Sequence, residues 1–396
     1  EWDFNGVYDS NHYKPKTITA GAVLHATKRL SLSFNASENN GPPRFERTVL
    51  PNGGVPPPIT GSGRDYGKIN LSAVAQDGQT LAKVEAAIES AIATLGYRSN
   101  PLARSMITGK TRTIGLAILD IRNPHFTNIV KGANRIALQN DYTLLLVDTE
   151  ESQERERQLI EALAQRVDGM IVSSRMPEEA IQWMVELNKP VVLFGRTREL
   201  QIPSVGSDSH LAAYMLAKHL LNEGHRQVAY LGFGQSRWNA ERIRGVSECF
   251  QEAGLTVDIH DAHAPSAQAG EQACSAIMLA PKRPQAVICY NDLIALGFMK
   301  EARALGFNLP DDVSVVGFDN VPYGEYSSPA LTTMDLQSER MGEVAMQKLL
   351  DLLAGQNGDG EYALLEPRLV VRESTRRREA VANAMPLPAA KSRRKA

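Results

Sequence analysis

Apolar residues follow two different periods along this chain, and the changes of period mark out its elements. From residue 114 onward, short apolar runs alternate with stretches whose apolar positions recur every three or four residues, as strands and helices do. The predicted strands are Ile114–Leu119, Thr143–Val147, Gly169–Ser173, Val191–Phe194, Gln227–Gly232, Ala286–Tyr290 and Val313–Gly317. The predicted helices are Thr127–Gln139, Gln153–Gln165, Glu178–Leu187, Leu211–Asn222, Ala240–Ala253, Gln268–Leu279, Ile294–Leu305 and Ser338–Ala354. This alternation predicts an α/β fold of right-handed βαβ units in doubly wound parallel sheets.

The chain is expected to pass between two such sheets, which divides the body at residues 113–376 into two lobes. A break falls at Ser204–Asp208, and the apolar-polar run Leu331–Asp335 suits a crossover back to the first lobe. The predicted bounds are residues 113–207 and 336–364 for lobe 1, and residues 208–335 and 365–376 for lobe 2. Such crossings leave a cleft between the lobes that hinge motion can close.

A small helical unit is predicted before this body. Apolar residues recur at the helical period between Thr80 and Leu95, and Gly96 follows them, as glycine commonly follows a helix. Pro101 suits the first turn of a second, short helix that ends at Met106. The helical unit would occupy residues 69–96, and the short helix with a basic linker would occupy residues 97–112.

The two ends of the chain lack a sustained period. Residues 1–68 carry the turn-forming stretches Asn39–Pro43 and Asn52–Gly54 and three consecutive prolines from Pro56, so we predict loop or disorder there. Residues 377–396 are rich in arginine and lysine and are predicted to form a disordered basic tail.

Composition places the chain among cytoplasmic proteins with a sizeable core. Its 396 residues are 43% hydrophobic and carry a formal net charge of −2, so any surface that binds nucleic acid must be local. Cys249, Cys274 and Cys289 are widely spaced and fit reduced core residues. The sequence has no apolar run long enough for a membrane span and no visible signal peptide, so we expect no membrane partner.

The sequence offers little for an enzyme. Gly232-Phe233-Gly234 follows a predicted strand, but neither a phosphate-binding loop nor a third glycine at dinucleotide spacing accompanies it. The histidines are scattered, and His225 sits where a helix leads into a strand, which favours a structural role. We therefore predict that the chain is not an enzyme and needs no cofactor or metal.

Candidate ligand contacts lie in the loops that leave the carboxyl ends of the strands, where open α/β sheets hold ligands. The loop Asp120–Phe126 could form one wall, although Phe126 could equally pack into the helix behind it. Arg242 presents a planar set of donors to hydroxyls or a carboxylate, and Trp238 could stack on a sugar face. Asn291-Asp292 and Asp319 stand directly beyond strand ends, and for Asp292 we favour a helix N-cap.

These residues resemble the lactose-repressor/galactose-repressor (LacI/GalR) family of bacterial transcription regulators. The resemblance rests on the segment Tyr97–Met106, on Asn123-Pro124-His125-Phe126, on Asn291-Asp292 and on Gly317-Phe318-Asp319-Asn320, and extends over about residues 80–376. It implies a periplasmic-binding-protein-like body. The implied effector contacts are Asp120, Asn123, His125, Phe126, Arg196, Trp238, Arg242, Asn291 and Asp319. His125 departs from the family's usual aromatic residue, which should alter the shape of the effector.

The resemblance also implies a hinge helix that enters the DNA minor groove. Met106 stands where relatives use a leucine as a wedge between base pairs, and methionine is flexible enough to serve. Asn100, Ala103 and Arg104 would line the groove. The implied phosphate contacts are Ser105, Thr108 and Lys110. A plain linker helix is the alternative reading of the same residues.

The family's helix-turn-helix is atypical in this chain. In Leu71–Thr80, Ala75 and Gly78 are one residue too close for the usual pattern. Either a compressed helix-turn-helix remains at residues 69–96, or only its third helix survives, which we favour. A shifted reading frame at the N-terminus would produce the same loss of pattern.

The sequence thus predicts a ligand-responsive DNA-binding repressor that acts as a homodimer on a roughly palindromic operator. A sugar or similar polyol is the expected effector, because the candidate residues combine polar groups with flat aromatic faces. The alternative is a sugar-binding sensor that has lost sequence-specific DNA binding.

Overall fold

The computed structural model describes residues 17–22, 32–37, 110–195, 197, 200–356 and 361–378. The chain divides into two compact units, residues 1–111 and 112–396. In the first unit, β1 (Thr17–Ala22) pairs antiparallel with β2 (Leu32–Ser37). This pair corrects the prediction of loop or disorder for residues 1–68 at those two stretches, whose threonine, isoleucine, leucine and phenylalanine favour strands. The predicted helical unit at residues 69–96 lies outside the described residues.

Lobe 1 of the second unit is built on a six-stranded parallel sheet with the order β13-β7-β6-β5-β3-β4. Its strands are β3 (Thr113–Ile118), β4 (Thr143–Asp148), β5 (Gly169–Val172), β6 (Val191–Phe194), β7 (Ser204–Ser207) and β13 (Tyr362–Leu365). Helices α3 (Pro124–Gln139) and α10 (Ser338–Leu353) share a core with one face of the sheet. Helix α4 (Gln153–Ala164) and the 3-10 helix η1 (Glu178–Leu187) cover the other face.

Lobe 2 repeats this plan with the strand order β14-β12-β11-β10-β8-β9. Its strands are β8 (Val228–Gly232), β9 (Val257–Asp261), β10 (Ala286–Cys289), β11 (Ser314–Phe318), β12 (Thr332–Asp335) and β14 (Arg368–Val370). Only β14 runs antiparallel to its neighbour among these described strands. Helices α7 (Ala267–Met278) and α8 (Asp292–Ala304) cover one face, and α5 (Ser209–Asn222) and α6 (Arg237–Glu252) cover the other. The short helix α9 (Pro322–Glu325) follows β11.

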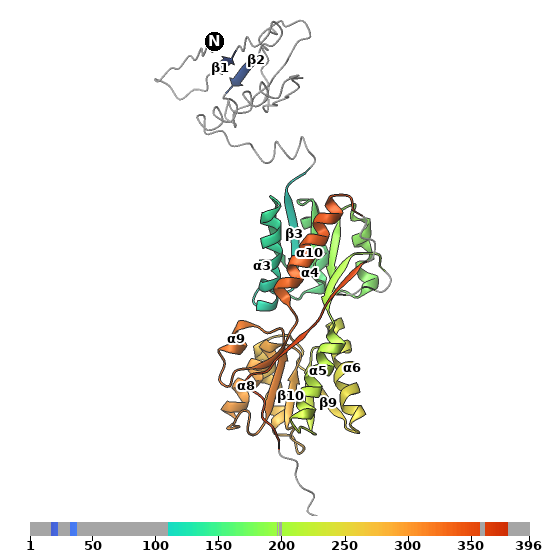
Figure 1. Cartoon of the computed structure of the whole chain (residues 1–396), viewed down its shortest axis with the longest axis vertical. Coiled ribbons are helices and arrows are strands. Elements are labelled where there is room, and N and C mark those ends of the chain that lie inside the picture. Colours follow the sequence, from blue (N-terminus) through green and yellow to red (C-terminus); the bar gives the residue numbers. More distant parts are fainter. Residues whose placement is uncertain are drawn as a thin grey trace, which may run out of the picture. The chain divides into compact units, whose positions relative to one another are not determined.

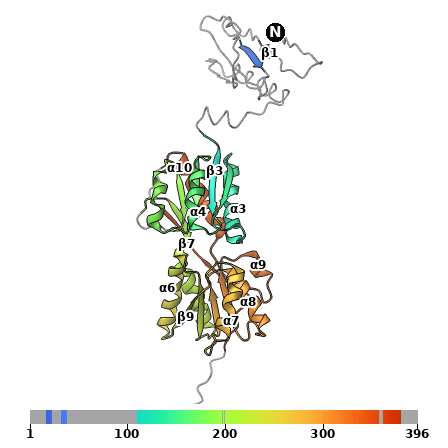
Figure 2. The same cartoon turned by 180° about the vertical axis from the view of Figure 1, so that it is seen from behind.

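The chain passes between the lobes three times. These crossings follow β7, β12 and β13, and in Figure 1 the last two appear as red and orange segments that join the lobes. In the reverse view, α6 lies on one side of the lobe 2 strands, and α7 and α8 lie on the other (Figure 2). The carboxyl ends of the parallel strands therefore face the crossings, which is where this class of fold holds its ligands.

The predicted fold class is confirmed, and all seven predicted strands are present with ends within two residues. The sequence reading missed β7, β9, β13 and β14: β7, β9 and β14 lack a continuous apolar run of four residues, and β13 is a four-residue run that no predicted element included. It also assigned Leu331–Asp335 to a crossover, whereas Thr332–Asp335 is β12 and the crossover follows it.

The C-terminal segment corrects a second boundary. Arg377 and Arg378 were assigned to a disordered tail, but Arg378 donates its backbone N–H to Glu223 and its Nη2 to the Asp312 carbonyl, 3.0 Å away. Arg376 also donates its backbone N–H to Ser314 Oγ. Lobe 2 thus continues to residue 378, and the rest of the predicted tail lies outside the described residues.

Glycines allow the helix pairs to pack closely. A Cβ added at Gly342 of α10 would collide with the Ile129 carbonyl of α3, and one at Gly132 would collide with the Glu339 carbonyl of α10. Gly297 of α8 meets the backbone of α7 at Ala267 in the same way. Each lobe therefore contains a helix pair whose backbones touch, and such contacts resist sliding.

Replacing Gly342 by alanine should destabilise the body. The added methyl group must push α10 away from α3, and overpacking of this kind costs about 1–3 kcal/mol. Thermal unfolding of Gly342→Ala should show a lower Tm than the parent chain. The control is Gln347→Ala at an exposed position of the same helix. Equal Tm values for the two variants would contradict this packing.

Candidate functional site

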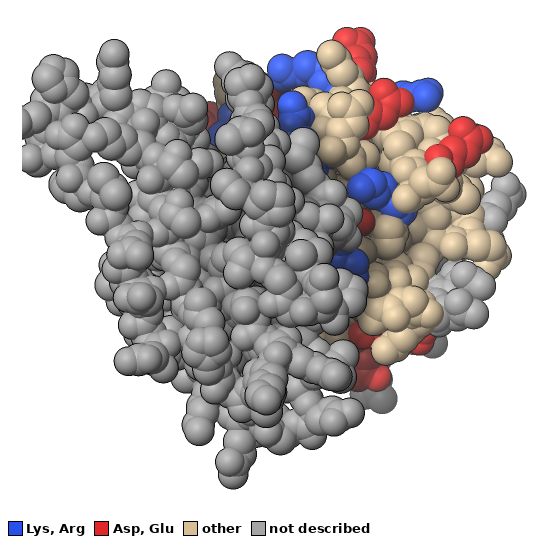
Figure 3. Space-filling model, turned by 90° about the horizontal axis from the view of Figure 1, so that it is seen from above, with Lys and Arg blue, Asp and Glu red and all other residues tan. Residues whose placement is uncertain are grey.

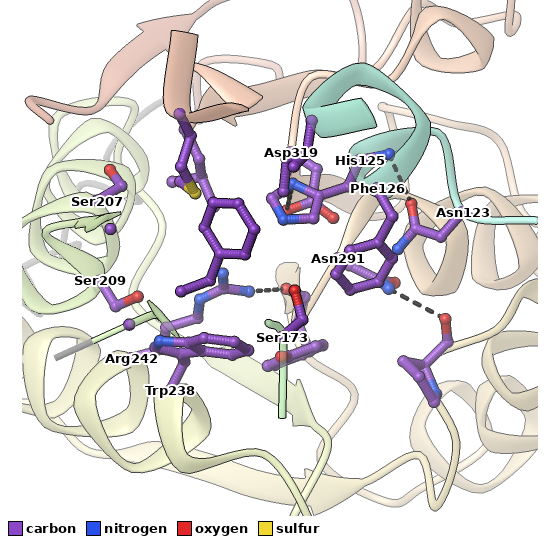
Figure 4. A pocket seen from close by; sticks show the side chains of 18 of the residues that line it. Asn123, His125, Phe126, Ser173, Ser207, Ser209, Trp238, Arg242, Asn291 and Asp319 are labelled. Atoms are coloured by element: carbon purple, nitrogen blue, oxygen red, sulfur yellow. Dashed lines mark hydrogen bonds and ion pairs between the residues drawn. The ribbon is translucent and has the colours of Figure 1, made fainter. Parts of the chain in front are cut away.

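A cavity lies between the lobes at the carboxyl ends of both sheets (Figure 4). Seven of the nine predicted effector contacts line it, and these are Asn123, His125, Phe126, Trp238, Arg242, Asn291 and Asp319. The cavity encloses about 50 Å³. The two remaining candidates differ: Asp120 lies elsewhere, and Arg196 falls outside the described residues.

The start of α3 supplies three of the lining residues from lobe 1. Asn123 is the N-cap of the helix, and its side-chain oxygen accepts the His125 backbone N–H at 3.0 Å. Pro124 occupies the first turn, where its fixed φ suits a helix. Phe126 lines the cavity and also belongs to the lobe 1 core, so both readings of its side chain hold.

Asp120 does not line the cavity, which corrects its assignment as an effector contact. Its carboxylate accepts the Arg122 backbone N–H at 2.9 Å and pairs with the Arg122 guanidinium. An aspartate at the start of a turn commonly bonds to the backbone two residues later. Asp120 therefore shapes the loop that presents Asn123.

Arg242 projects from α6 into the cavity and is 4% exposed. Its guanidinium carbon lies 4.6 Å from the Tyr290 ring centroid and 4.3 Å from that of Phe318. One end of the guanidinium donates to the Tyr290 carbonyl, and Nε has no partner among the described residues. The aromatic rings thus hold the guanidinium flat and leave donors for a ligand.

Asp319 follows β11 and shares the cavity with Arg242. Its φ of +106° is unusual for a residue with a side chain, and its N–H donates to the Met334 carbonyl at 2.9 Å. Burial raises the pKa of the Asp319 carboxyl, and the charges of His125, Arg242 and Arg175 and a hydrogen bond with Asn123 oppose that rise. Both Asp319 and Arg242 belong to lobe 2, so they lie on the same side of the cleft. His125 is the lobe 1 residue opposite Asp319.

The N-cap of α8 is Asn291 and not Asp292, which corrects the sequence prediction. Asn291 is the N-cap of α8, since its side-chain oxygen accepts the Ile294 N–H at 2.8 Å. Asp292 was favoured for that role, but its fully buried carboxylate instead accepts Thr333 Oγ1 at 2.6 Å and the Val321 N–H at 2.8 Å. Asp292 therefore ties α8 to β12 and to the N-cap of α9, while Asn291 both caps the helix and lines the cavity.

Trp238 brings lobe 2 against lobe 1. A Cβ at Gly195, which follows β6 with φ +88°, would collide with the Trp238 indole. The neighbouring Arg237 donates Nη2 to the Phe194 carbonyl of lobe 1 at 2.9 Å. The glycine at the end of β6 thus permits close contact between the lobes beside the cavity.

Arg175 is a lining residue that the sequence reading missed. It follows β5 of lobe 1, and its guanidinium bonds Glu151 of the same lobe through two nitrogens. Its Nη1 lies 3.3 Å from Ser236 Oγ of lobe 2, and its guanidinium carbon lies 5.5 Å from the Trp238 ring centroid. The preceding Ser173 has a buried hydroxyl without a partner in the described part of the chain. The polar run Ser173-Ser174-Arg175, at the carboxyl end of a predicted strand, was the signal that could have identified Arg175 as a lining residue.

The predicted DNA contacts cannot be placed in the same way. Lys110 is exposed just ahead of β3, and Asn100, Ala103, Arg104, Ser105, Met106 and Thr108 lie outside the described residues. On the described surface seen from above, lysine and arginine are interspersed with aspartate and glutamate (Figure 3).

Two absences hold for the described residues. They contain no group of three or more histidine, cysteine, aspartate or glutamate side chains placed to hold a metal ion. No helix there is long and apolar enough to cross a membrane.

Known proteins with this sequence pattern are transcriptional repressors. The chain is 30% identical over 302 residues to the HTH-type transcriptional repressor PurR of Vibrio vulnificus, an alignment that covers 73% of this chain and 89% of that protein. The chain belongs to the LacI/GalR family. Residues 217–375 also match the periplasmic binding protein-like domain. PurR and CytR, two proteins that match this chain, are named as transcriptional repressors and not as enzymes.

Solved structures of LacI/GalR members have the same architecture. The lac repressor dimer bound to operator and an anti-inducer aligns with a TM-score of 0.68 and 25% identity, covering 74% of this chain and 91% of that one. A LacI-family regulator from Enterococcus faecium with bound ribose aligns with a TM-score of 0.62 and 25% identity, covering 67% of this chain and all of that one.

Removing the Arg175 side chain should loosen the contact between the lobes. Arg175→Ala loses the bond to Ser236 and the stacking on Trp238, and leaves Glu151 without its cation. We expect the Trp238 indole to become more accessible, and acrylamide quenching of its fluorescence should increase. Arg340→Ala, at an exposed position of α10, is the control. Unchanged quenching in Arg175→Ala would show that the residue does not hold the lobes together.

Proposed function

We propose that the chain is a transcriptional repressor whose affinity for operator DNA is set by a small sugar-like effector bound between its lobes. The observation that carries the proposal is the cavity itself, where the donors of Arg242 and the carboxyl of Asp319 meet beside the flat face of Trp238. Polar groups that fix hydroxyls, together with aromatic faces for the C–H surface of a ring, are what a sugar requires.

The size of the cavity favours a small ligand. Its volume of about 50 Å³ holds only a few water-sized molecules, so even a single-ring sugar requires the lobes to open and close again around it. An oligosaccharide would need the lobes to separate further. The unpartnered Ser173 hydroxyl and the Arg242 Nε are the groups we assign to ligand hydroxyls.

The effector would control DNA through lobe closure. It would contact lobe 1 through Asn123 and Phe126 and lobe 2 through Arg242, so it binds the closed arrangement better than the open one. In a homodimer, closure changes the separation of the two hinge segments and thereby the affinity for DNA. The hinge residues proposed for the minor groove are Asn100, Ala103, Arg104 and Met106, with Ser105, Thr108 and Lys110 on phosphates. We propose that this regulation of DNA binding takes place in the cytoplasm, and we assign the chain no catalytic step.

A mobility-shift experiment tests both halves of the proposal. The full chain should shift the DNA that flanks its own gene, and the shift should weaken steeply with salt because phosphate contacts release counterions. A panel of monosaccharides, D-ribose among them, should alter the shift. Sugar binding without any shift would favour the sensor that has lost DNA binding.

Arg242→Ala should abolish the response to the effector while leaving the DNA affinity of the free protein near that of the parent. Loss of a charge-assisted, bidentate contact costs about 1.5–3 kcal/mol, or roughly 10- to 150-fold in effector affinity. The control is Arg226→Ala, at the distant start of β8. A full effector response in Arg242→Ala would refute the proposed site.

The homodimer is proposed through an exposed aromatic face on lobe 2. Tyr323 and Tyr326, in and just after α9, are 57% and 82% exposed, and exposed aromatics in a cluster mark interaction surfaces. Tyr326→Asp should shift the chain from dimer to monomer in sedimentation velocity. Leu279→Asp, at an exposed apolar position elsewhere on the lobe, should not. A dimeric Tyr326→Asp variant would exclude this face.

A further inference from the structure

His125 joins three separate segments at the edge of the cavity. It sits in the first turn of α3 in lobe 1, and its Nδ1 lies 2.8 Å from the hydroxyl of Ser338, the first residue of α10. The same nitrogen lies 3.6 Å from Asp319 Oδ1 of lobe 2 (Figure 4). Because Ser338 follows the crossover from lobe 2, His125 contacts both the opposite lobe and a segment that connects them.

Both of these contacts use Nδ1, so Nε2 is the ring nitrogen left to meet a ligand in the cavity that His125 lines. The side chain is buried, with 15% of its surface exposed. Its contact with Asp319 forms only when the lobes are together, because Asp319 moves with lobe 2.

The charges around His125 disfavour a positive charge on its ring. The guanidinium groups of Arg242 and Arg175 face it from α6 and from the end of β5, and Asp319 is the acid that faces it. Burial lowers the pKa of His125, the two arginines lower it further, and Asp319 opposes them. Geometry and charge both favour a neutral imidazole between the closed lobes.

We propose that closing the lobes on the effector expels a proton from His125, so that the effector binds more tightly at neutral than at acid pH. This inference rests on the proposed function and deepens it, because it couples the same site to protons. His125 would also take part in ligand recognition, since Nε2 of the neutral ring remains available to a ligand hydroxyl.

The direction of the pH effect follows from the pKa of His125 in the open and in the closed arrangement of the lobes. When the lobes separate, His125 leaves Asp319 and Arg242, which belong to lobe 2, becomes hydrated and has an ordinary pKa of about 6.5. Since its pKa is lower in the closed arrangement, closure releases a proton below about pH 6.5, and acidification disfavours it by up to about tenfold per pH unit. Asp319 acts with the opposite sign, because burial raises its pKa above the ordinary value. A variant without a titrating group at residue 125 separates the two contributions.

The decisive experiment needs no ligand. Acrylamide quenching of Trp238 is followed from pH 7.5 to 5.5 in a full-length chain carrying Trp2→Phe and Trp183→Phe, in which Trp238 is the remaining tryptophan. Quenching should rise on acidification as the open fraction grows about tenfold. Adding His125→Phe or His125→Gln should abolish the rise. His263→Phe is the matched control, because that ring is 87% exposed and is not among the residues that line the cavity.

A flat quenching profile in the parent chain, or a rise that persists in both His125 variants, would overturn the proposal. The Phe and Gln variants differ in shape and hydrogen bonding, so agreement between them excludes a mere packing defect. D-Ribose is the ligand probe for a second arm, in which calorimetry in buffers of different ionisation enthalpy measures the released proton. A protein that shows the pH response but neither binds sugar nor shifts DNA would refute the proposed function and not the protonation of His125.

Discussion

The burial of charge between the lobes is the constraint on which the other features depend. Arg175, Arg242 and Asp319 are each less than a tenth exposed, and a charge in such a place costs several kcal/mol unless it is paired. Arg175 pairs with Glu151 of its own lobe and donates a further hydrogen bond to Ser236 of lobe 2, and Asp319 lies 3.6 Å from the His125 ring of lobe 1. The lobes cannot separate without hydrating these groups again. Closure and the satisfaction of buried charge are therefore one event, which a ligand supplying its own hydrogen bonds can favour.

Motion in this body is confined to the crossings. The helix pairs α3–α10 and α7–α8 touch through glycines, so each lobe resists internal sliding. Three connecting segments join the lobes. A body of two rigid halves with short connections moves by hinge rotation. Ser338 lies at the end of one connection and bonds His125. A contact at the cavity is thus also a contact with the hinge.

The sequence predicted the fold well because buried parallel strands are continuous apolar runs, as in Val191–Phe194, which the structure reproduces residue for residue. It failed at β9 and β14, since exposed edge strands carry no such run. The site was predictable from the strand-end rule together with the family resemblance. Arg175 was missed because its partners lie far along the chain, and Asp292 was misjudged because Thr333, which holds it, belongs to an unrecognised strand.

In the proposed function, β3 is the element that connects the cavity to the segment that precedes the body. The strand begins at Thr113, directly after the basic linker, and lies between β4 and β5 inside its sheet. Its other end leads into the Asn123 cap and His125. One stiff strand therefore separates the residues that meet the effector from the point where the linker leaves the body. A rotation of lobe 1 set by contacts at Asn123 and His125 would move the start of β3 with it, because β3 lies between two strands of the same sheet.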